Sequence, residues 1–316
     1  FSEKTFAVFI GDESRKPKVI EHEQDADGIE EELLMEIPID YKREFDKDLL
    51  NSLRDIAGVS TLATHPFITD RESVSACFRK DHLIFNMPSV DFQRTRLVIF
   101  KEKFFKPELP RFVHVDLAIS QDSAGFAVGT VTGFTDIDRG QVIETLPNIY
   151  IDGLLQVSPP PNGEILISKI RDVIYTLKKL GMNIRWVTFD TFQSTDSLQI
   201  LRQAGFIVGY QSMDKTPNPY TVTKYAMYDK RVNMPYHSVV ERELVSLERD
   251  VKKNKIDHPP TGSKDVSDAL AGVVFGCTMR REYWGLYKVP VQKIPESIKS
   301  MAASKDNMKA PIPQAA

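Results

Sequence analysis

Cysteine is scarce in this sequence, and long apolar runs are missing. Only Cys77 and Cys277 occur among 316 residues, which argues against a disulfide framework and a thiolate zinc site and indicates a reducing compartment. No apolar stretch approaches the roughly 18 residues that cross a bilayer. The opening FSEKTFAVFI also lacks the basic start and cleavage pattern of a secretory signal. We therefore expect a soluble globular protein that is not secreted and has no membrane partner.

Three short motifs are absent as well, and each absence excludes a class of enzyme. No G-x-x-x-x-G-K-S/T loop is present, so the sequence has no P-loop for ATP, and no G-x-G-x-x-G follows a strand, which excludes a dinucleotide fold. There is also no G-x-S-x-G nucleophile elbow. What is present is enough apolar content, 41%, for a chain of this length to bury a full core.

The formal net charge of -3 is unevenly distributed along the chain. Residues 1–50 contain seven Lys and Arg against fifteen Asp and Glu, which leaves 34 basic and 29 acidic residues in the rest. A mildly basic body with an acidic leader is compatible with binding a phosphate backbone. Lys224 and Arg231 in KYAMYDKRV are candidate DNA contacts. A solvated charged surface explains the same distribution equally well.

Residues 1–107 give weaker structural signals than the rest of the chain. TFAVFIG predicts a strand, and EHEQDADGIEEE after it predicts an acidic stretch of low order. Residues 37–58 have apolar side chains at helical spacing before a glycine, which predicts an amphipathic helix. Residues 59–107 contain three prolines and predict a connecting region. Because the chain starts at Phe1 rather than Met, we interpret it as part of a longer polypeptide, with residues 1–107 as an N-terminal extension or connector, which could include the end of a preceding ATPase domain.

The patterns become clearer from residue 108 onward. Two β-rich runs joined by QDSAG, followed by a third run, predict a three-stranded antiparallel meander. The elements expected after it are helices at 167–181 and 194–205, strands at 183–190 and 206–212, a long helix at about 223–253 and a final helix at 263–281. This order predicts an α/β domain over residues 108–288, with a mixed β-sheet flanked by helices on both faces. Residues 289–316, rich in Pro, Lys, Ala and Met, predict a flexible C-terminal tail.

Four aspartates in three clusters carry the strongest functional signal. Asp116 lies inside the first strand of the meander, and Asp190 ends a strand that we expect to pair with it in parallel, because a helical crossover separates the two. Asp265 and Asp268 open the last helix on one face. Four carboxylates at one sheet edge suit Mg²⁺ or Mn²⁺ and not zinc. Two such ions, roughly 4 Å apart, would support in-line displacement at a phosphodiester.

Each aspartate also has an ordinary structural explanation to consider. Asp265 and Asp268 fit the start of a helix, where the helix dipole favours acids, and Asp190 can cap the helix after its strand. Asp116 is different, because an acid between Val115 and Leu117 inside a strand has no capping role. Its convergence with the other three favours a metal site.

Three further residues are candidates for positions around such a site. Asp122 follows Asp116 in the predicted hairpin and is either a turn residue or an outer ligand. His258 in IDHPPTGSKD is a candidate for positioning water, or an ordinary polar loop residue. Lys264 beside the acidic pair would contact a phosphate or neutralise the carboxylates before a metal binds, with a solvated lysine as the alternative.

Three segments together resemble a known family. HVDLAISQDSAGFAVG, WVTFDTFQS and IDHPPTGSKDVSDALAG are similar to the nuclease domain of the large terminase subunit of tailed double-stranded DNA bacteriophages, a ribonuclease H-like fold. The resemblance covers roughly residues 108–285, and the His-Pro-Pro loop running into SKDVSDALAG is its most specific element. It implies that Asp116 and Asp190 are the first and second metal ligands, and that Asp268 or Asp265 supplies the third.

The resemblance also implies a biological setting. In that family the nuclease follows an ATPase motor domain that drives DNA into an empty capsid, and it cuts the concatemeric genome. The expected partners are double-stranded DNA, the portal protein, the small terminase subunit and an ATPase motor domain, in the cytoplasm of the infected bacterial host. The ATPase signature is absent from this chain, so ATP hydrolysis is not expected of it. A junction resolvase of the RuvC type and a non-catalytic scaffold that binds DNA or a portal are the competing hypotheses.

Overall fold

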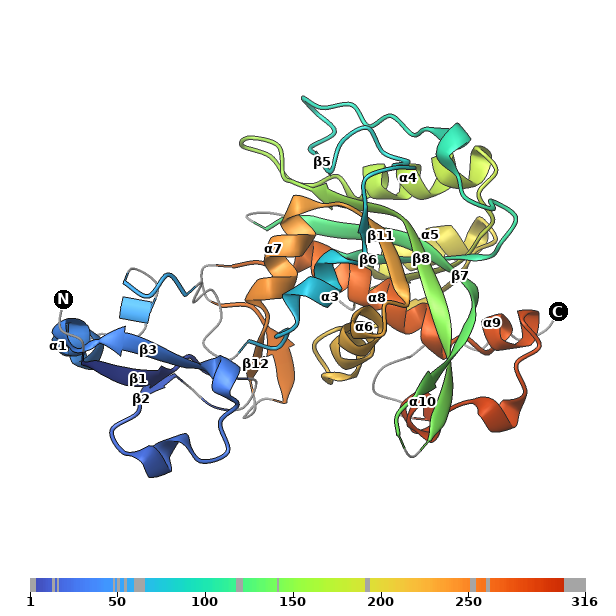
Figure 1. The fold of residues 1–316 in the computed structure, drawn as a ribbon. Coiled ribbons are helices and arrows are strands. Elements are labelled where there is room, and N and C mark those ends of the chain that lie inside the picture. The colour runs from blue at the N-terminus through green and yellow to red at the C-terminus, as the bar shows by residue number, and fades with distance from the viewer. Residues whose placement is uncertain are drawn as a thin grey trace. The chain divides into compact units, whose positions relative to one another are not determined.

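The chain forms two compact units, shown in Figure 1. The smaller unit comprises Phe1–Arg71 and Arg242–Ser263, and the larger unit comprises Glu72–Glu241 and Lys264–Ala316. The structure is a computed structural model. It describes residues 4–12, 15, 17–47, 49, 52–53, 56–59, 66–117, 122–140, 142–190, 194–250, 254–259 and 262–303.

The smaller unit is built on a three-stranded antiparallel sheet of order β2-β1-β3. Its described elements are β1 (Thr5–Phe9), β2 (Lys18–Val19), η1 (Glu23–Ala26), η2 (Glu31–Leu33), β3 (Leu34–Pro38), η3 (Ile39–Tyr41), α1 (Lys42–Lys47), β12 (Glu248–Asp250) and β13 (Lys255–Asp257). The strand predicted in TFAVFIG is confirmed as β1. The helix predicted from residue 37 starts later, because Ile37 pairs with Phe6 in the sheet and is buried there beside Phe45.

The larger unit contains an eight-stranded mixed sheet. Its strands are β4 (Phe78–Arg79), β5 (Ser89–Val90), β6 (Arg111–Asp116), β7 (Ala124–Asp138), β8 (Ile143–Val157), β9 (Ile184–Phe189), β10 (Ile207–Tyr210) and β11 (Val232–Pro235). Strands β6, β7 and β8 form the antiparallel meander, and β9 and β10 extend it in parallel on the β6 side. On the other side β11 lies parallel to β8 and β4 parallel to β11, while β5 pairs in parallel with the end of β8.

Helices cover both faces of this sheet. Those of the larger unit are α4 (Ile167–Lys179), α5 (Thr195–Gln203), α6 (Asn218–Tyr228), α8 (Asp265–Met279), α9 (Arg281–Leu286) and α10 (Glu296–Ala303), with the short turns η4 (Lys101–Lys103) and η5 (Val291–Lys293). Two further helices, α3 (Arg71–Ser75) and α7 (Ser238–Ser246), contain residues of both units. Figure 1 shows α4 and α8 on opposite sides of the sheet.

The alternation of side chains along β6 explains this layering. Val113 and Val115 join the core cluster that includes the apolar face of α4. Phe112 and His114 point the other way, against α8, where a Cβ on Gly276 or Gly272 would collide with their rings. Successive residues of a strand face opposite sides of a sheet, so one short strand supplies both layers. The predicted mixed sheet, an antiparallel meander extended by parallel strands and flanked by helices on both faces, is confirmed.

The prediction of a long helix at about residues 223–253 is wrong. The chain instead forms α6, then strand β11, then α7 and β12. Lys230 adopts a positive φ of 55° directly after α6, which ends the helix, and the following VNMP pairs with Ile149 and Tyr150 of β8. Pairing with β8 therefore makes a strand of a segment that was predicted to be helical.

Both ends of the predicted nuclease domain also differ from expectation. The connecting region assigned to residues 59–107 belongs, from Glu72 onward, to the larger unit, and its Ile84, Phe85 and Val90 pack into the main core. The segment predicted as a flexible tail is helical at η5 and α10 because Ile294 and Ile298 are buried. Residues 304–316 lie outside the described residues. No helix in the described ranges is long and apolar enough to cross a membrane.

Candidate active site

Asp116 and Asp190 lie at the same level on two neighbouring strands. Strands β6 and β9 pair in parallel with Val115 opposite Phe189, and the Asp190 backbone N–H donates to the Val115 carbonyl over 3.2 Å. Both aspartates are half-buried. The parallel pairing that the sequence predicted therefore brings these two carboxylates to one edge of the sheet.

The first turn of α8 reaches the same place because of a glycine in β7. Asp116 is paired across the sheet with Gly125, and a Cβ at Gly125 would lie 1.8 Å from the backbone carbonyl oxygen of Asp265. No other amino acid allows the start of α8 to approach the strand so closely. Asp265 and Asp268 of that first turn are thus held beside Asp116.

The pKa of Asp116 is affected by all of these neighbouring charges. Burial raises the pKa of Asp116 well above its usual value, and the carboxylates of Asp268, Asp265 and Asp190 raise it further, in that order, while Lys264 lowers it. The four aspartates singled out from the sequence thus lie near enough to repel one another. A site of this kind is stabilised by a cation.

Lys264 is a cation that the protein itself supplies. Its Nζ lies 3.0 Å from Oδ2 of Asp268 and 2.6 Å from Oδ1 of Asp214, and the lysine side chain is only 8% exposed. Burial would lower the pKa of Lys264, but Asp268 and Asp214 raise it above its usual value, so the ammonium stays charged. Of the two roles predicted for Lys264, this geometry matches neutralisation of the carboxylates.

Asp268 is also held from the α6 side. The Tyr220 hydroxyl donates to Asp268 Oδ1 over 2.6 Å, and the same hydroxyl lies 3.0 Å from Ser267 Oγ. Burial raises the pKa of Asp268, and this prevails over the lowering by Lys264 and by the Tyr220 hydrogen bond. Sequence reasoning missed Tyr220 and Asp214, because only the tertiary structure brings them to this carboxylate and to its lysine.

His114, two residues before Asp116, is a second group that the sequence reasoning passed over. It is fully buried, and its Nδ1 lies 2.8 Å from Thr188 Oγ1 of β9. Burial lowers the pKa of His114 to about 4, although Asp190 opposes the shift. The imidazole is therefore neutral near pH 7 and does not balance the carboxylates. The ring packs beneath Gly272 of α8, so it helps to set the distance between that helix and the sheet.

The other residues predicted around the site are placed differently. Asp122 is exposed, and residues 118–121 before it lie outside the described residues. His258 belongs to the smaller unit, where its Nδ1 lies 2.7 Å from the Pro259 carbonyl oxygen. Neither is among the groups that shift the pKa of Asp116.

The two candidate DNA contacts are buried. Lys224 is 8% exposed and lies over the Tyr228 ring, and Arg231 is 6% exposed, pairs with Asp229 at 3.1 Å and donates to the Pro147 carbonyl. Burial lowers the pKa of Arg231, although Asp229 opposes this. Buried cations that internal groups already engage are poorly placed for phosphate, so the structure does not support the interpretation of Lys224 and Arg231 as DNA contacts.

The donor set of the site fits a hard divalent cation in its chemistry. Asp116, Asp190, Asp265 and Asp268 offer only carboxylate oxygens, which Mg²⁺ and Mn²⁺ prefer. Among the described residues, no three acidic, histidine or cysteine side chains are arranged to hold a metal ion as they stand. Because Lys264 occupies one side of Asp268, side chains at this edge would have to rearrange when a divalent ion binds.

Comparisons with known proteins give matches in structure alone. The sequence matches no protein-family model and no curated protein. The large terminase nuclease from the thermophilic phage G20c is 16% identical, with a TM-score of 0.43, covering 66% of this chain and 97% of that chain. Crystal structures of the same nuclease with bound magnesium and with bound cobalt give the same values. The large terminase of bacteriophage HK97 is 14% identical, with a TM-score of 0.40, covering 75% of this chain and 50% of that one. The solved structures to which this chain is similar thus include nuclease domains of phage large terminases.

Proposed function

We propose that this chain is a metal-dependent endonuclease that hydrolyses double-stranded DNA during bacteriophage genome packaging. The observation that carries the proposal is the gathering of three aspartates, one directly after β9 and two from α8, around Asp116 of β6, whose pKa is raised first by burial and then by these three carboxylates. If these aspartates were separate helix caps, they would not need to lie close together. A site for hard cations requires that they do.

The residues that would hold the metal are Asp116, Asp190, Asp268 and Asp265. A pair of Mg²⁺ or Mn²⁺ ions bound there would supply Lewis-acid chemistry at a phosphodiester, activating water and stabilising the leaving oxygen. The chain itself orients the carboxylates. Gly125 lets α8 approach the strand, and the Tyr220 hydroxyl fixes one oxygen of Asp268. Lys264 keeps the metal-free site neutralised in part, and it carries the positive charge that a phosphate would meet.

The resemblance of the three sequence segments to terminase nucleases suggests the biological setting. On this proposal the chain acts in the cytoplasm of an infected bacterium, with DNA, a portal protein, a small terminase subunit and an ATPase motor domain as partners. A junction resolvase with the same metal site, and a scaffold that binds DNA or a portal without cutting, are the alternatives to be separated by experiment.

A plasmid-cleavage assay tests the proposal directly. Supercoiled plasmid is incubated with the protein in Mg²⁺, in Mn²⁺ and in EDTA. We expect nicked and linear products only with metal, and Asp116→Ala and Asp190→Ala should each cut more slowly by roughly 10³-fold or more. The matched control is Asp138→Asn, an exposed aspartate at the other end of β7, which should cut like the parent.

Two results would contradict the proposal. If Asp116→Ala and Asp190→Ala each cut as well as the parent, the site assignment is wrong. If the parent binds DNA but never cuts it, the scaffold hypothesis takes its place. Comparing a linear duplex with a four-way junction separates the packaging nuclease from the resolvase, which would strongly prefer the branched substrate.

A further inference from the structure

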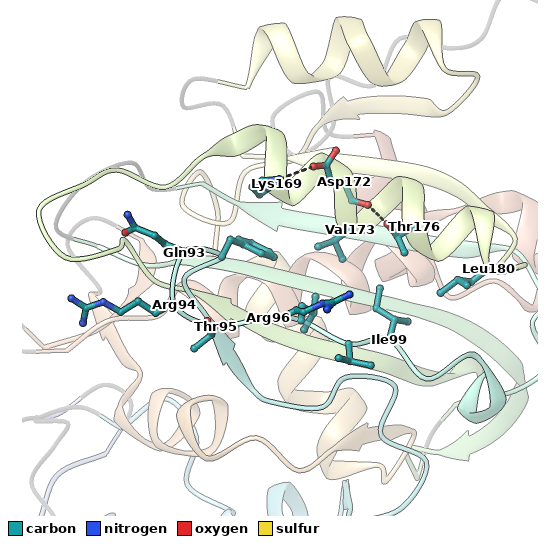
Figure 2. A pocket seen from close by; sticks show the side chains of 13 residues that line it. Gln93, Arg94, Thr95, Arg96, Ile99, Lys169, Asp172, Val173, Thr176 and Leu180 are labelled. Carbon is teal, nitrogen blue, oxygen red and sulfur yellow. Dashed lines mark hydrogen bonds and ion pairs between the residues drawn. The ribbon is translucent and has the colours of Figure 1, made fainter.

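A groove of about 530 Å³ lies between residues 92–99 and helix α4 of the larger unit. Figure 2 shows its two sides, the loop that carries Arg94 and Arg96 and the helix that carries Lys169. The floor is formed by apolar side chains such as Ile99 and Val173, which pack against or belong to the main core. The functional residues predicted from the sequence include none of these.

The loop starts in the same transverse row of the sheet as the catalytic candidate Asp116. Asp116 pairs with Gly125, Gly125 with Gln156, and Gln156 with Ser89 of β5. Neighbouring strands are about 4.8 Å apart, so three steps place the start of the loop roughly 14 Å from Asp116. Because β5 and β8 run parallel to β6, the chain leaves β5 at the same edge of the sheet as the four aspartates. The first turn of α4, with Lys169, follows β8 at that edge too.

Side-chain hydrogen bonds give the loop one defined conformation. Asp91 Oδ1 accepts from the backbone N–H groups of Gln93, Arg94 and Thr95 at 2.8 to 3.0 Å, and from the Thr95 hydroxyl. These bonds, the one to Arg94 first, lower the pKa of Asp91 to about 2. Where the loop returns past Asn86, Asn86 Oδ1 accepts from the Val98 backbone N–H and Asn86 Nδ2 donates to the Arg96 carbonyl. The loop is therefore held in shape by groups other than its arginine side chains.

The charges at the groove are mainly positive. Arg94, Arg96 and Lys169 are exposed. Asp172 is the acidic residue of the lining, and its 3.6 Å ion pair with Lys169 joins side chains that are 61% and 47% exposed. An exposed pair of this kind is weak and is easily exchanged for another partner. In Figure 2 the side chain of Arg96 lies along the groove, whereas Arg94 points outward at the end of the loop.

We propose that this groove binds the phosphate backbone of the DNA that flanks the scissile bond. The inference rests on the proposed nuclease function and extends it to a second DNA-binding surface. Ser89, where the loop leaves β5, is roughly 14 Å from Asp116 across the sheet, which corresponds to about four base pairs of duplex at about 3.4 Å of rise. The forked guanidinium groups of Arg94 and Arg96 match phosphate oxygens, and a loop already held by Asp91 loses little entropy on binding. The loop and α4 position the substrate and take no part in the chemistry.

Binding without cleavage is the appropriate test. The affinity of a short fluorescein-labelled duplex is measured by anisotropy in EDTA, over a series of salt concentrations, for the parent and for Arg94→Ala/Arg96→Ala. We expect roughly tenfold weaker binding, and a logarithmic salt slope that is shallower by about 0.9 for each phosphate that the variant no longer neutralises. The control is Lys101→Ala/Lys103→Ala, which removes two exposed positive charges from the neighbouring turn η4, outside the groove.

The outcomes separate this inference from the nuclease proposal. If the parent cuts plasmid but Arg94→Ala/Arg96→Ala binds like the parent, or weakens no more than Lys101→Ala/Lys103→Ala, the groove does not bind DNA while the nuclease stands. If the parent neither binds nor cuts DNA, the nuclease proposal has failed. If an acidic peptide binds the groove and duplex DNA does not, the occupant is a protein and the inference is overturned. Thermal melting of both double variants checks that the fold is intact.

Discussion

Two charge clusters in the larger unit, one fully buried and one partly buried, differ in their balance of charge. At the start of β6, Arg111 and Asp152 are both fully buried and pair through two hydrogen bonds of 3.1 and 3.0 Å. The guanidinium also donates to the carbonyls of Phe105, Lys106 and Leu109, so every part of it has an acceptor. The ion pair ties the segment before β6 to β8 in the middle of the sheet. Its charges cancel.

At the end of β6 the charges do not cancel. Asp116 faces three other aspartates and one lysine, and the lysine already serves Asp268 and Asp214. Burying an excess of one sign destabilises a fold unless a ligand completes it. Strand β6 therefore has at one end an ion pair whose charges cancel, and at the other end a site with an excess of negative charge. Balance distinguishes a structural charge cluster from one built for a ligand.

The largest expected effect is at the balanced end. Arg111→Met would leave Asp152 and three carbonyls without their donor, and we expect a loss of about 3–5 kcal/mol in the free energy of unfolding, measured by urea denaturation. Because burial already raises the pKa of Asp152 against the influence of Arg111, the isolated acid would be neutral in the variant. The double variant Arg111→Met/Asp152→Leu should recover part of the loss. Full stability in the single variant would show that the pair is not structural.

Removing the lysine from the unbalanced end should cost less in EDTA and respond to metal. Lys264→Met leaves Asp268 and the half-exposed Asp214 without this cation, and we expect a loss of roughly 2 kcal/mol, below the range for fully buried pairs. The rise in Tm on adding Mg²⁺ should then be larger for the variant than for the parent, because the ion has no ammonium to displace. Lys293→Met, which removes an exposed cation 3.6 Å from Asp136, is the control. An unchanged metal response would show that Lys264 does not compete with the ion.

The approach of α8 to Gly125 offers a third comparison, this time of backbone geometry. Gly125→Ala puts a methyl group where the Asp265 carbonyl lies, and we expect a cost of about 1–3 kcal/mol together with a marked loss of cleavage. Gly133→Ala in the same strand is the matched control, since its nearest atom, Asn148 Nδ2, is 3.9 Å away. Equal cleavage by the two variants would mean that this glycine does not set the distance between α8 and the sheet.

The smallest effect should have the opposite sign. Asp116→Asn removes one charge from the unbalanced cluster, and we expect the metal-free protein to gain roughly 0.5–2 kcal/mol near neutral pH, with cleavage lost. A carboxyl whose pKa is raised on folding binds more protons in the folded state, so its contribution to stability falls as pH rises from about 4 toward the folded value. The advantage of Asp116→Asn over the parent should therefore grow with pH across that window. A pH-independent difference in urea midpoints would refute the assignment.

Much of the fold could be predicted because its signals are local. The β6–β7–β8 meander follows from its β-rich runs, and α4, β9, α5, β10 and α8 follow from apolar periodicity and glycine stops and each lie within a few residues of their predicted ranges. The failures were also local patterns, interpreted without their partners. VNMP lies inside the predicted helix at about 223–253, but it forms a strand because it pairs in parallel with β8. The segment after residue 289 looked flexible by composition, although Ile294 and Ile298 are buried.

The residues of the candidate site also divide into those with a local signal in the sequence and those without one. Asp116 could be singled out because an acid between two apolar neighbours inside a strand has no local explanation, and the other aspartates followed from their positions at the ends of a strand and a helix. Tyr220 and Asp214 carry no such signal, since tyrosine and aspartate are common in helices and loops. Lys224 and Arg231 show the converse, because charge in a sequence says nothing about burial and both side chains are buried.

The sequence by itself determined which residue types are available and on which elements they lie, because helix and strand periodicity are properties of neighbouring residues. It placed Asp116, Asp190, Asp265 and Asp268 where a mixed sheet could bring them together. Only the tertiary structure decided how closely they meet and which further groups contact them. The approach of α8 across Gly125, the hydrogen bond from Tyr220 to Asp268 and the pairing of Lys264 with Asp214 depend on contacts between segments that are distant along the chain. The balance of charge at each end of β6 is a sum over such contacts, and no local pattern contains it.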